Sequence, residues 1–260
     1  KIHGAAAGDN AITAQSMSGG SIILGESDDR VEIFGDIANA TIDLGAGVNT
    51  LRNTLAAGED PAQAGQGSAT GNAVRNSNII LSGRTNAYLG YIKNGAKVYG
   101  TGTNNINAAK VEDSTIDASG MTGTYIGVGA LKGTVGGDGK SSAAITAGSG
   151  GRIDVNTMDG GDIYDRKGQN AIVVGDMGET AAINIDEAIH STSIHVNKLG
   201  GVLNLGNHNY AGADANKFTV ADTAYSGTVK IEGARVDGAG TAAPAVDTGD
   251  FGLGEGGPVA

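Results

Sequence analysis

Three aspartates at matching places in the sequence are the first residues to consider for catalysis. Asp43, Asp117 and Asp154 each follow an isoleucine within a short apolar run. Stacked coils would place such carboxylates in a row, and paired carboxylates perform the acid and base steps of sugar cleavage. Ile80 interrupts the row, and the chain has no Trp to form a sugar platform. We therefore expect no catalytic residues and no enzymatic activity.

Three histidines near two acids are the second candidate for chemistry. His190, His195 and His208 lie close to Asp186 and Glu187, and three imidazoles with a carboxylate can hold zinc. On a strand whose neighbouring Ile and Val point inward, however, His195 would point to solvent. We expect surface histidines and no metal site.

The stretch 44–51 is the third candidate. It resembles the calcium-binding nonapeptide of RTX β-rolls, whose pattern is G-G-x-G-x-D-x-apolar-x. Leu44 stands in place of the first Gly, and Asn49 stands in place of the Asp. Calcium needs several oxygen ligands, usually including carboxylates, and no tandem array of the motif supplies them. A Gly-rich corner is the favoured interpretation, and no cofactor is expected.

Two further Gly-containing motifs have weaker chemical implications. Residues 136–140 look like a fragment of a phosphate-binding loop but lack its spacing and its following helix, so a turn is predicted. The Thr-Gly-Thr triplets at 101–103 and 122–124 are similar to those of ice-binding solenoids, which need a flat Thr ladder. The triplets are 21 residues apart and do not follow the main period described next.

An isoleucine recurs every 37 residues through much of the chain, and this spacing must organise any site. The positions are Ile42, Ile79, Ile116 and Ile153 and, after a slip of four residues, Ile194 and Ile231. A fixed period of this size is typical of stacked repeats. Each unit holds short apolar runs with period-2 alternation, bounded by turn residues, which predict short strands. We expect all six isoleucines to point inward.

The composition favours a sheet over disorder. The chain has 260 residues, with 46 Gly, 3 Pro, no Cys and 4% aromatic residues, and residues 62–243 contain no Pro. A continuous ladder excludes Pro because it needs backbone N–H donors, and a solenoid buries small and β-branched side chains between coils. The prediction is an all-β fold, a β-solenoid (parallel β-helix). Its coil has either about 37 residues with three or four faces, or about 18–19 residues with two sheets.

The charge and hydropathy limit the partners. The net charge is −11, from 17 basic and 28 acidic residues, which argues against nucleic acid. No apolar run approaches the length of a transmembrane helix. Without Cys, disulfides and Cys-ligated metals are excluded. Because the chain begins at Lys1, we expect either a processed N-terminus after secretion or a trimmed chain.

The predicted organisation has three parts. Residues 1–20 form an N-terminal arm, residues 21–232 form the solenoid with a loop excursion at 52–76, and residues 233–260 form a Gly/Ala/Pro-rich C-terminal arm. No amphipathic helix caps either end. The segment Ala11, Ile12, Thr13 and Ala14 is free of Pro, and we expect it to contact another subunit as an added strand.

Four features of the sequence point to a known group of proteins. They are the run Ile-Asp-Leu-Gly at 42–45, the run Ile-Ile-Leu at 79–81, the richness in Gly, Asn, Thr and Ser, and the weak repeat. The chain resembles β-helical surface proteins of bacteria, namely autotransporter passengers, filamentous-haemagglutinin-like adhesins and sheath or surface-layer proteins. The resemblance covers residues 21–232. It implies an exported surface role and transfers no functional residue.

The sequence therefore predicts an extracellular or cell-surface protein with a structural or adhesive role. Self-association into a filament, sheath or lattice is expected, with host or cell-surface glycans as further partners. The alternative is a carbohydrate-active β-helix enzyme, a polysaccharide lyase or hydrolase, or a phage tail-fibre segment.

Overall fold

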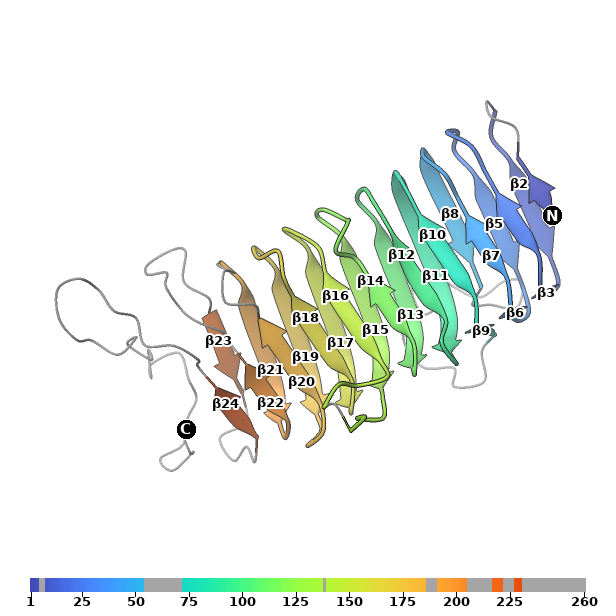
Figure 1. The fold of residues 1–260 in the computed structure, drawn as a ribbon. Coiled ribbons are helices and arrows are strands. Elements are labelled where there is room, and N and C mark those ends of the chain that lie inside the picture. The colour runs from blue at the N-terminus through green and yellow to red at the C-terminus, as the bar shows by residue number, and fades with distance from the viewer. Residues whose placement is uncertain are drawn as a thin grey trace.

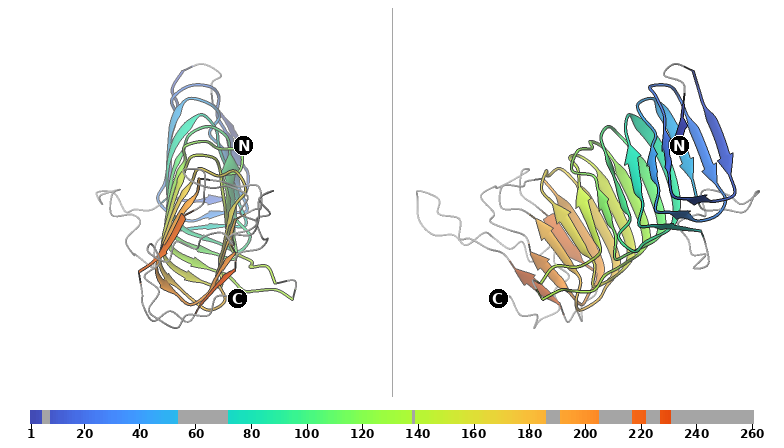
Figure 2. Two further views of the ribbon diagram at one scale, coloured as in Figure 1. Left: turned by 90° about the vertical axis from the view of Figure 1, so that its left-hand side faces the viewer. Right: turned by 45° about the vertical axis from the view of Figure 1, so that its right-hand side comes forward.

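The computed structural model describes residues 1–4, 8–53, 72–137, 139–185, 191–204, 217–221 and 227–230. Within these ranges all regular structure is β-strand, and the strands stack into a solenoid (Figure 1). The predicted all-β solenoid is confirmed. Viewed along the stack, two sheets face each other across a narrow interior (Figure 2).

Neighbouring strands pair in parallel between successive coils, and the strands at the two ends of each sheet pair on one side only within the described residues. One face, sheet A, is built in this order: β1 (Ile2–His3), β4 (Ser21–Ile23), β7 (Thr41–Asp43), β10 (Asn78–Leu81), β12 (Lys97–Gly100), β14 (Thr115–Asp117), β16 (Ala144–Ala147), β18 (Asp162–Asp165), β20 (Ala182–Ile185), β22 (Val202–Asn204) and β24 (Thr228–Lys230).

The opposite face, sheet B, has the order β2 (Ala11–Ala14), β5 (Arg30–Ile33), β8 (Val48–Arg52), β11 (Arg84–Lys93), β13 (Asn105–Glu112), β15 (Tyr125–Lys132), β17 (Arg152–Asp159), β19 (Ala171–Met177), β21 (Ser193–Leu199) and β23 (Lys217–Val220). The short strands β3 (Met17–Ser18), β6 (Ile37–Ala38) and β9 (Ala73–Arg75) continue this sheet at its lower edge, where β9 pairs with the end of β11.

The strand register settles the length of a coil. Ile79 pairs with Val98, and Val98 pairs with Ile116, so these two coils contain 19 and 18 residues. The short two-sheet coil is therefore the right alternative, and here the 37-residue period spans two coils. Ile42, in contrast, pairs directly with Ile79. That single coil is longer because it includes the excursion, whose residues 54–71 lie outside the described ranges.

The prediction that Ile116 and Ile153 occupy equivalent positions is wrong. Ile116 pairs with Ile145 in sheet A, whereas Ile153 lies on β17 of sheet B. An insertion at 133–143 lengthens the intervening coil, so the 37-residue spacing there is a coincidence. Ile194 also belongs to sheet B.

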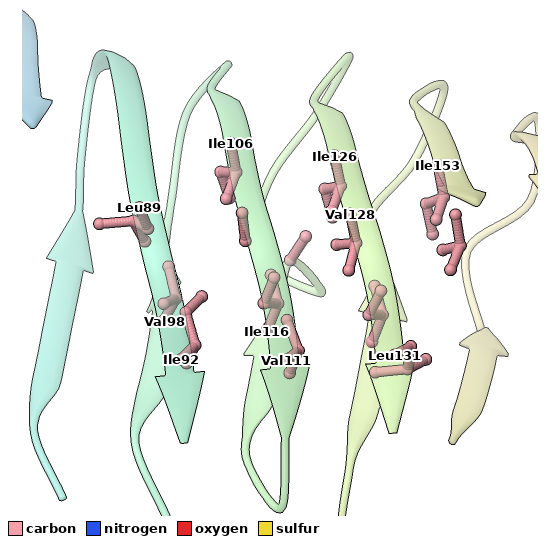
Figure 3. Close-up of a cluster of buried hydrophobic side chains, with 14 of the residues drawn as sticks. Leu89, Ile92, Val98, Ile106, Val111, Ile116, Ile126, Val128, Leu131 and Ile153 are labelled. Carbon is pink, nitrogen blue, oxygen red and sulfur yellow. The ribbon is translucent and has the colours of Figure 1, made fainter. Parts of the chain in front are cut away.

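The interior consists of columns of aliphatic side chains, one residue from each coil. Figure 3 shows such a cluster, in which Ile106, Ile126 and Ile153 follow one another along sheet B. Ile42, Ile79, Ile116, Ile153 and Ile194 are all buried, and Ile231 lies outside the described residues. Each buried aliphatic side chain contributes about 1.5–3 kcal/mol, so the repeating column stabilises every coil in the same way.

The ends of the predicted domains differ from the structure. Residues 1–20 were expected to form an arm, but β1, β2 and β3 within them pair with the second coil. Residues of the predicted arm thus form a coil of the solenoid. β8 continues to Arg52 and β9 begins at Ala73, which narrows the excursion predicted at 52–76. Residues 233–260 lie outside the described part of the chain.

Candidate functional site

Glycines allow the coils to approach at the corner that leads from sheet A to sheet B. Gly45 has φ 64° and Gly102 has φ 84°, a region that side chains rarely adopt. A Cβ on Gly45 would lie 1.8 Å from the carbonyl oxygen of Gly25, and one on Gly102 would lie 2.0 Å from that of Gly83. The coils that carry Gly45 and Gly102 therefore pack backbone on backbone at this corner.

Immediately after these glycines, buried polar side chains form a column that we call the buried ladder. Its members on successive coils are Asp29, Asn49, Thr85, Asn104, Thr124, Asn170 and Thr192, with Gly151 between Thr124 and Asn170, and each of the seven polar residues is at most 3% exposed.

The ladder joins coils through side-chain acceptors. The backbone N–H of Asp29 donates to Asn49 Oδ1 at 2.9 Å, and that of Thr85 donates to Asn104 Oδ1 at 3.0 Å. Asn104 in turn donates its backbone N–H to Thr124 Oγ1 at 3.2 Å. Because a buried polar group without a partner costs about 1–3 kcal/mol, the ladder fixes how coils align at this corner.

The ladder explains the stretch that resembles a calcium motif. Asn49, which replaces the motif's Asp, uses Oδ1 in the ladder and donates Nδ2 to the carbonyl oxygens of Gly45 and Ala46 at 3.2 and 3.0 Å. Its side chain is thus committed to the protein backbone. The stretch acts as a structural corner.

Asp165 is a fully buried carboxylate with a similar role. Its oxygens accept hydrogen bonds from the backbone N–H groups of Lys167 and Gly168, from Asn170 Nδ2 and from Thr192 Oγ1, at 2.5–3.1 Å. These four donors occupy most of the acceptor capacity of a carboxylate. Asp165 therefore organises the corner next to the ladder.

The other two Gly-containing motifs also form local structure. In the triplet 122–124, Thr124 is buried in the ladder whereas Thr122 is exposed, so the triplets form corners and do not form a flat Thr surface. At the tip of the 133–143 insertion, the N–H groups of Gly136 and Gly139 donate to the backbone carbonyls of Lys140 and Gly136. These donors close a tight turn.

The three aspartates considered for catalysis do not form a row. Asp43 and Asp117 point outward from sheet A, where Ile80 and Tyr99 lie between them, and Asp154 lies on sheet B. The inferred common position depended on the 37-residue spacing. The structure therefore corrects this alignment of carboxylates.

The predicted histidine cluster is only partly visible. His195 lies on β21, and its Nε2 is 3.1 Å from Oδ1 of Asn197 on the exposed side of the strand. His190, His208, Asp186 and Glu187 lie outside the described ranges. Among the residues that the structure describes, no group of three or more His, Asp or Glu side chains could hold a metal ion.

The outer face of sheet B carries ion pairs on several coils. Examples are Arg30 with Glu32 at 2.6 Å and Lys198 with Asp176 at 3.3 Å. The outward positions of sheet A carry fewer charges, among them Asp43, Lys97 and Asp117, between Thr, Ser, Asn, Ile, Ala and Tyr residues.

Tyr125 belongs to one of these outer clusters. Its ring lies beside Gly127, where a Cβ would be 3.0 Å from the phenol oxygen. Burial raises the pKa of Tyr125, and the charge of Asp154 and a hydrogen bond to it raise this pKa further. Arg152, paired with Asp154 at 2.9 Å, has its own pKa raised by the hydrogen bond and the charge of that carboxylate.

The first coil exposes one edge of each sheet. The carbonyl groups of Asn10 and Ala14 accept hydrogen bonds from the N–H groups of Arg30, in β5, and of Phe34, directly after it, at 2.8 and 3.0 Å. Since backbone groups of alternate residues point to opposite sides of a strand, those of Ala11 and Thr13 point away from β5. Among the described residues they face no further strand. We call this side of β1 and β2 the open edge.

The first coil also has apolar side chains that are partly exposed to solvent beside the open edge. Ile2 continues the column of Ile22 and is 47% exposed. Ile12, Ala14 and Met17 are only partly buried, although they pack against the core. An unpaired edge with a partly exposed apolar column favours addition of another strand.

The buried ladder had a sequence signal that the isoleucine period does not contain. The pattern Gly-x-Asn/Thr occurs at Gly47, Gly83, Gly102 and Gly168, each with positive φ and each followed two residues later by a ladder member. The step from Gly83 to Gly102 equals one coil. The segment of the open edge was named in sequence as the Pro-free run Ala11–Ala14, but which of its backbone groups are unpaired depends on the strand pairing.

The chain matches no known family model, no curated protein and no solved structure. Within the described ranges, the structure contains no helix of the length and apolarity required to cross a membrane.

Proposed function

We propose that this protein is an extracellular structural or adhesive protein whose copies assemble through β-contacts into a filament, sheath or lattice. The extracellular location rests on the resemblance to bacterial surface solenoids. The observation that carries the assembly is the open edge, where Ala11 and Thr13 direct their backbone groups away from the solenoid.

Within the described residues, the other end of the solenoid offers a complementary surface. β23 and β24 are the last described strands of the two sheets, and each pairs on one side only within the described residues. Stacking this end on the open edge of a second copy would continue both parallel sheets. Such a head-to-tail contact is heterologous, so it propagates until a ring closes.

The test is a proline placed where it affects only the open edge. Thr13→Pro removes an N–H that points away from β5, and proline is tolerated at such an edge position. We expect the full chain to form ordered polymers in sedimentation and negative-stain microscopy. Thr13→Pro should abolish the polymers and leave the far-ultraviolet strand signal intact.

The matched variant Ile12→Pro acts on the other side of β2. In the wild type the Ile12 N–H points toward β5. Its loss in Ile12→Pro should therefore destabilise the first coil itself. Deletion of residues 1–20 is a poorer test, because it exposes an equivalent edge on β4 and β5. A full chain that stays monomeric at high concentration, or a Thr13→Pro variant that polymerises normally, would refute the proposed assembly.

A further inference from the structure

A cluster of cationic and aromatic side chains lies on the outer face of sheet B. We call it the Tyr–Lys patch, and it consists of Arg52, Tyr88, Tyr91, Lys93 and Lys110. Lys93 Nζ lies 4.4 Å and Lys110 Nζ lies 4.7 Å from the centroid of the Tyr91 ring. Lys110 Nζ is also 3.0 Å from Tyr91 Oη, and the Arg52 guanidinium lies 5.6 Å from the Tyr88 centroid.

The strand register places this patch across three successive coils. Arg52 lies opposite Tyr88 where β8 pairs with β11, and Tyr91 lies opposite Lys110 where β11 pairs with β13. All five side chains are half-buried. They are thus held by their neighbours and remain partly exposed to solvent.

The patch concentrates positive charge in an acidic chain. The two distances to the Tyr91 ring add to about 9 Å, which is the largest possible separation of the two ammonium groups. Glu112 pairs with Lys110 at 3.2 Å and lies opposite Lys93, and Glu32 lies opposite Arg52, whereas Lys93 itself forms no ion pair among the described residues. Arg75 lies opposite Lys93 and pairs with Asp36. Like charges on neighbouring strands repel each other.

We propose that the Tyr–Lys patch binds an acidic polysaccharide through the carboxylates of its uronic acid units. A carboxylate placed between Lys93 and Lys110 would relieve their repulsion, and Arg52 can accept a second one in a bidentate pair. The Tyr rings hold the cations in place before binding, which lowers the entropic cost. The net charge of −11 opposes any polyanion at long range, so the attraction must come from the short-range contacts of the patch.

This inference deepens the adhesive part of the proposed function and rests on it. The test is titration calorimetry of the full chain with polygalacturonate, with dextran as the neutral polymer, at low salt. Lys93→Gln with Lys110→Gln should weaken polygalacturonate binding by about tenfold or more. Tyr91→Leu should weaken it severalfold without changing the charge, because the ammonium groups lose their support.

Lys198→Gln is the matched control. It removes one positive charge from the same outer face, several coils away, and should change the affinity by less than about twofold. Equal binding of polygalacturonate and dextran would overturn the inference, as would an equal loss of affinity in Lys198→Gln and the double variant.

The same titration on Thr13→Pro separates this inference from the assembly. If copies assemble through the open edge, Thr13→Pro should lose its polymers. If the Tyr–Lys patch binds polygalacturonate independently of assembly, the same variant should still bind it. Wild-type polymers that do not bind polygalacturonate would refute the patch alone. A wild-type chain that binds but never polymerises would refute the assembly alone.

Discussion

The buried ladder and the ion pairs on the outer face of sheet B are two polar networks that run along the same coils. The ladder is at most 3% exposed and joins backbone donors to neutral side-chain acceptors, with Asp29 as its one charged polar member in the described chain. Lys198 and Asp176 pair at 3.3 Å with side chains 66% and 58% exposed. Buried unpaired groups cost about 1–3 kcal/mol, whereas exposed pairs contribute about 0–1.

The difference teaches where stability and recognition are located. The inner network fixes the alignment of coils, and a change there must affect the fold. The outer network contributes little to folding, so its residues can vary to suit a partner. This separation is why both proposals above concern edges and outer faces, and the following changes test it.

The largest effect should come from the aliphatic core next to the ladder. Ile116 is fully buried between Val98 and Ile145. Ile116→Asp removes its packing and buries a charge, so we expect a loss of about 4 kcal/mol or complete unfolding in urea titration. The neighbouring Asp117→Asn should change stability by less than about 0.5 kcal/mol, because the amide oxygen can still accept the Ser119 N–H. Equal tolerance of both changes would contradict the assignment of the inward face.

The ladder itself should give the next largest effect. Asn104→Ala leaves the Thr85 N–H without its acceptor and the Thr101 carbonyl without its donor. We expect a loss of about 2–4 kcal/mol in the free energy of unfolding, independent of salt. Lys198→Ala, in the outer network, should cost less than about 0.5 kcal/mol. Similar losses for the two variants would remove the distinction between the networks.

Asp29 offers a change in the opposite direction. Its Oδ1 accepts from Asn10, but its buried Oδ2 has no hydrogen-bond partner. One coil further on, Asn49 uses its amide group to donate to two corner carbonyls. Asp29→Asn should supply the same donors and raise stability by about 1 kcal/mol in urea titration. A loss of stability would show that the carboxylate is needed at this corner.

The smallest effect concerns pH and the outer cluster at Tyr125. Its pKa is raised above the usual value of 10, first by burial and then by Asp154. The folded state therefore binds this proton more tightly, so the contribution is complete below about pH 10. It is lost as the pH rises through the folded-state pKa. Urea titrations between pH 8 and 11 should show that the free energy of unfolding falls less in Tyr125→Phe than in the wild type. Identical pH profiles would contradict a raised pKa of Tyr125.

The sequence predicts the fold class because alternating apolar runs and the absence of Pro depend only on local chemistry. Coil length could not be derived, since the spacing from Ile79 to Ile116 covers two coils and that from Ile42 to Ile79 covers one. Insertions change spacing without changing the stack. Asn49 and Asn104 share a Gly-x-Asn pattern in sequence, but the strand register is needed to show that they lie on one ladder.

The assembly through the open edge is tested most directly by residue-resolved amide hydrogen exchange of the full chain, dilute and assembled. Ile12 should be protected in both states, because its N–H points to β5. Ala11 and Thr13 should exchange rapidly when dilute and become protected on assembly, as their N–H groups gain a strand partner. Equally fast exchange of Thr13 in both states would contradict the account.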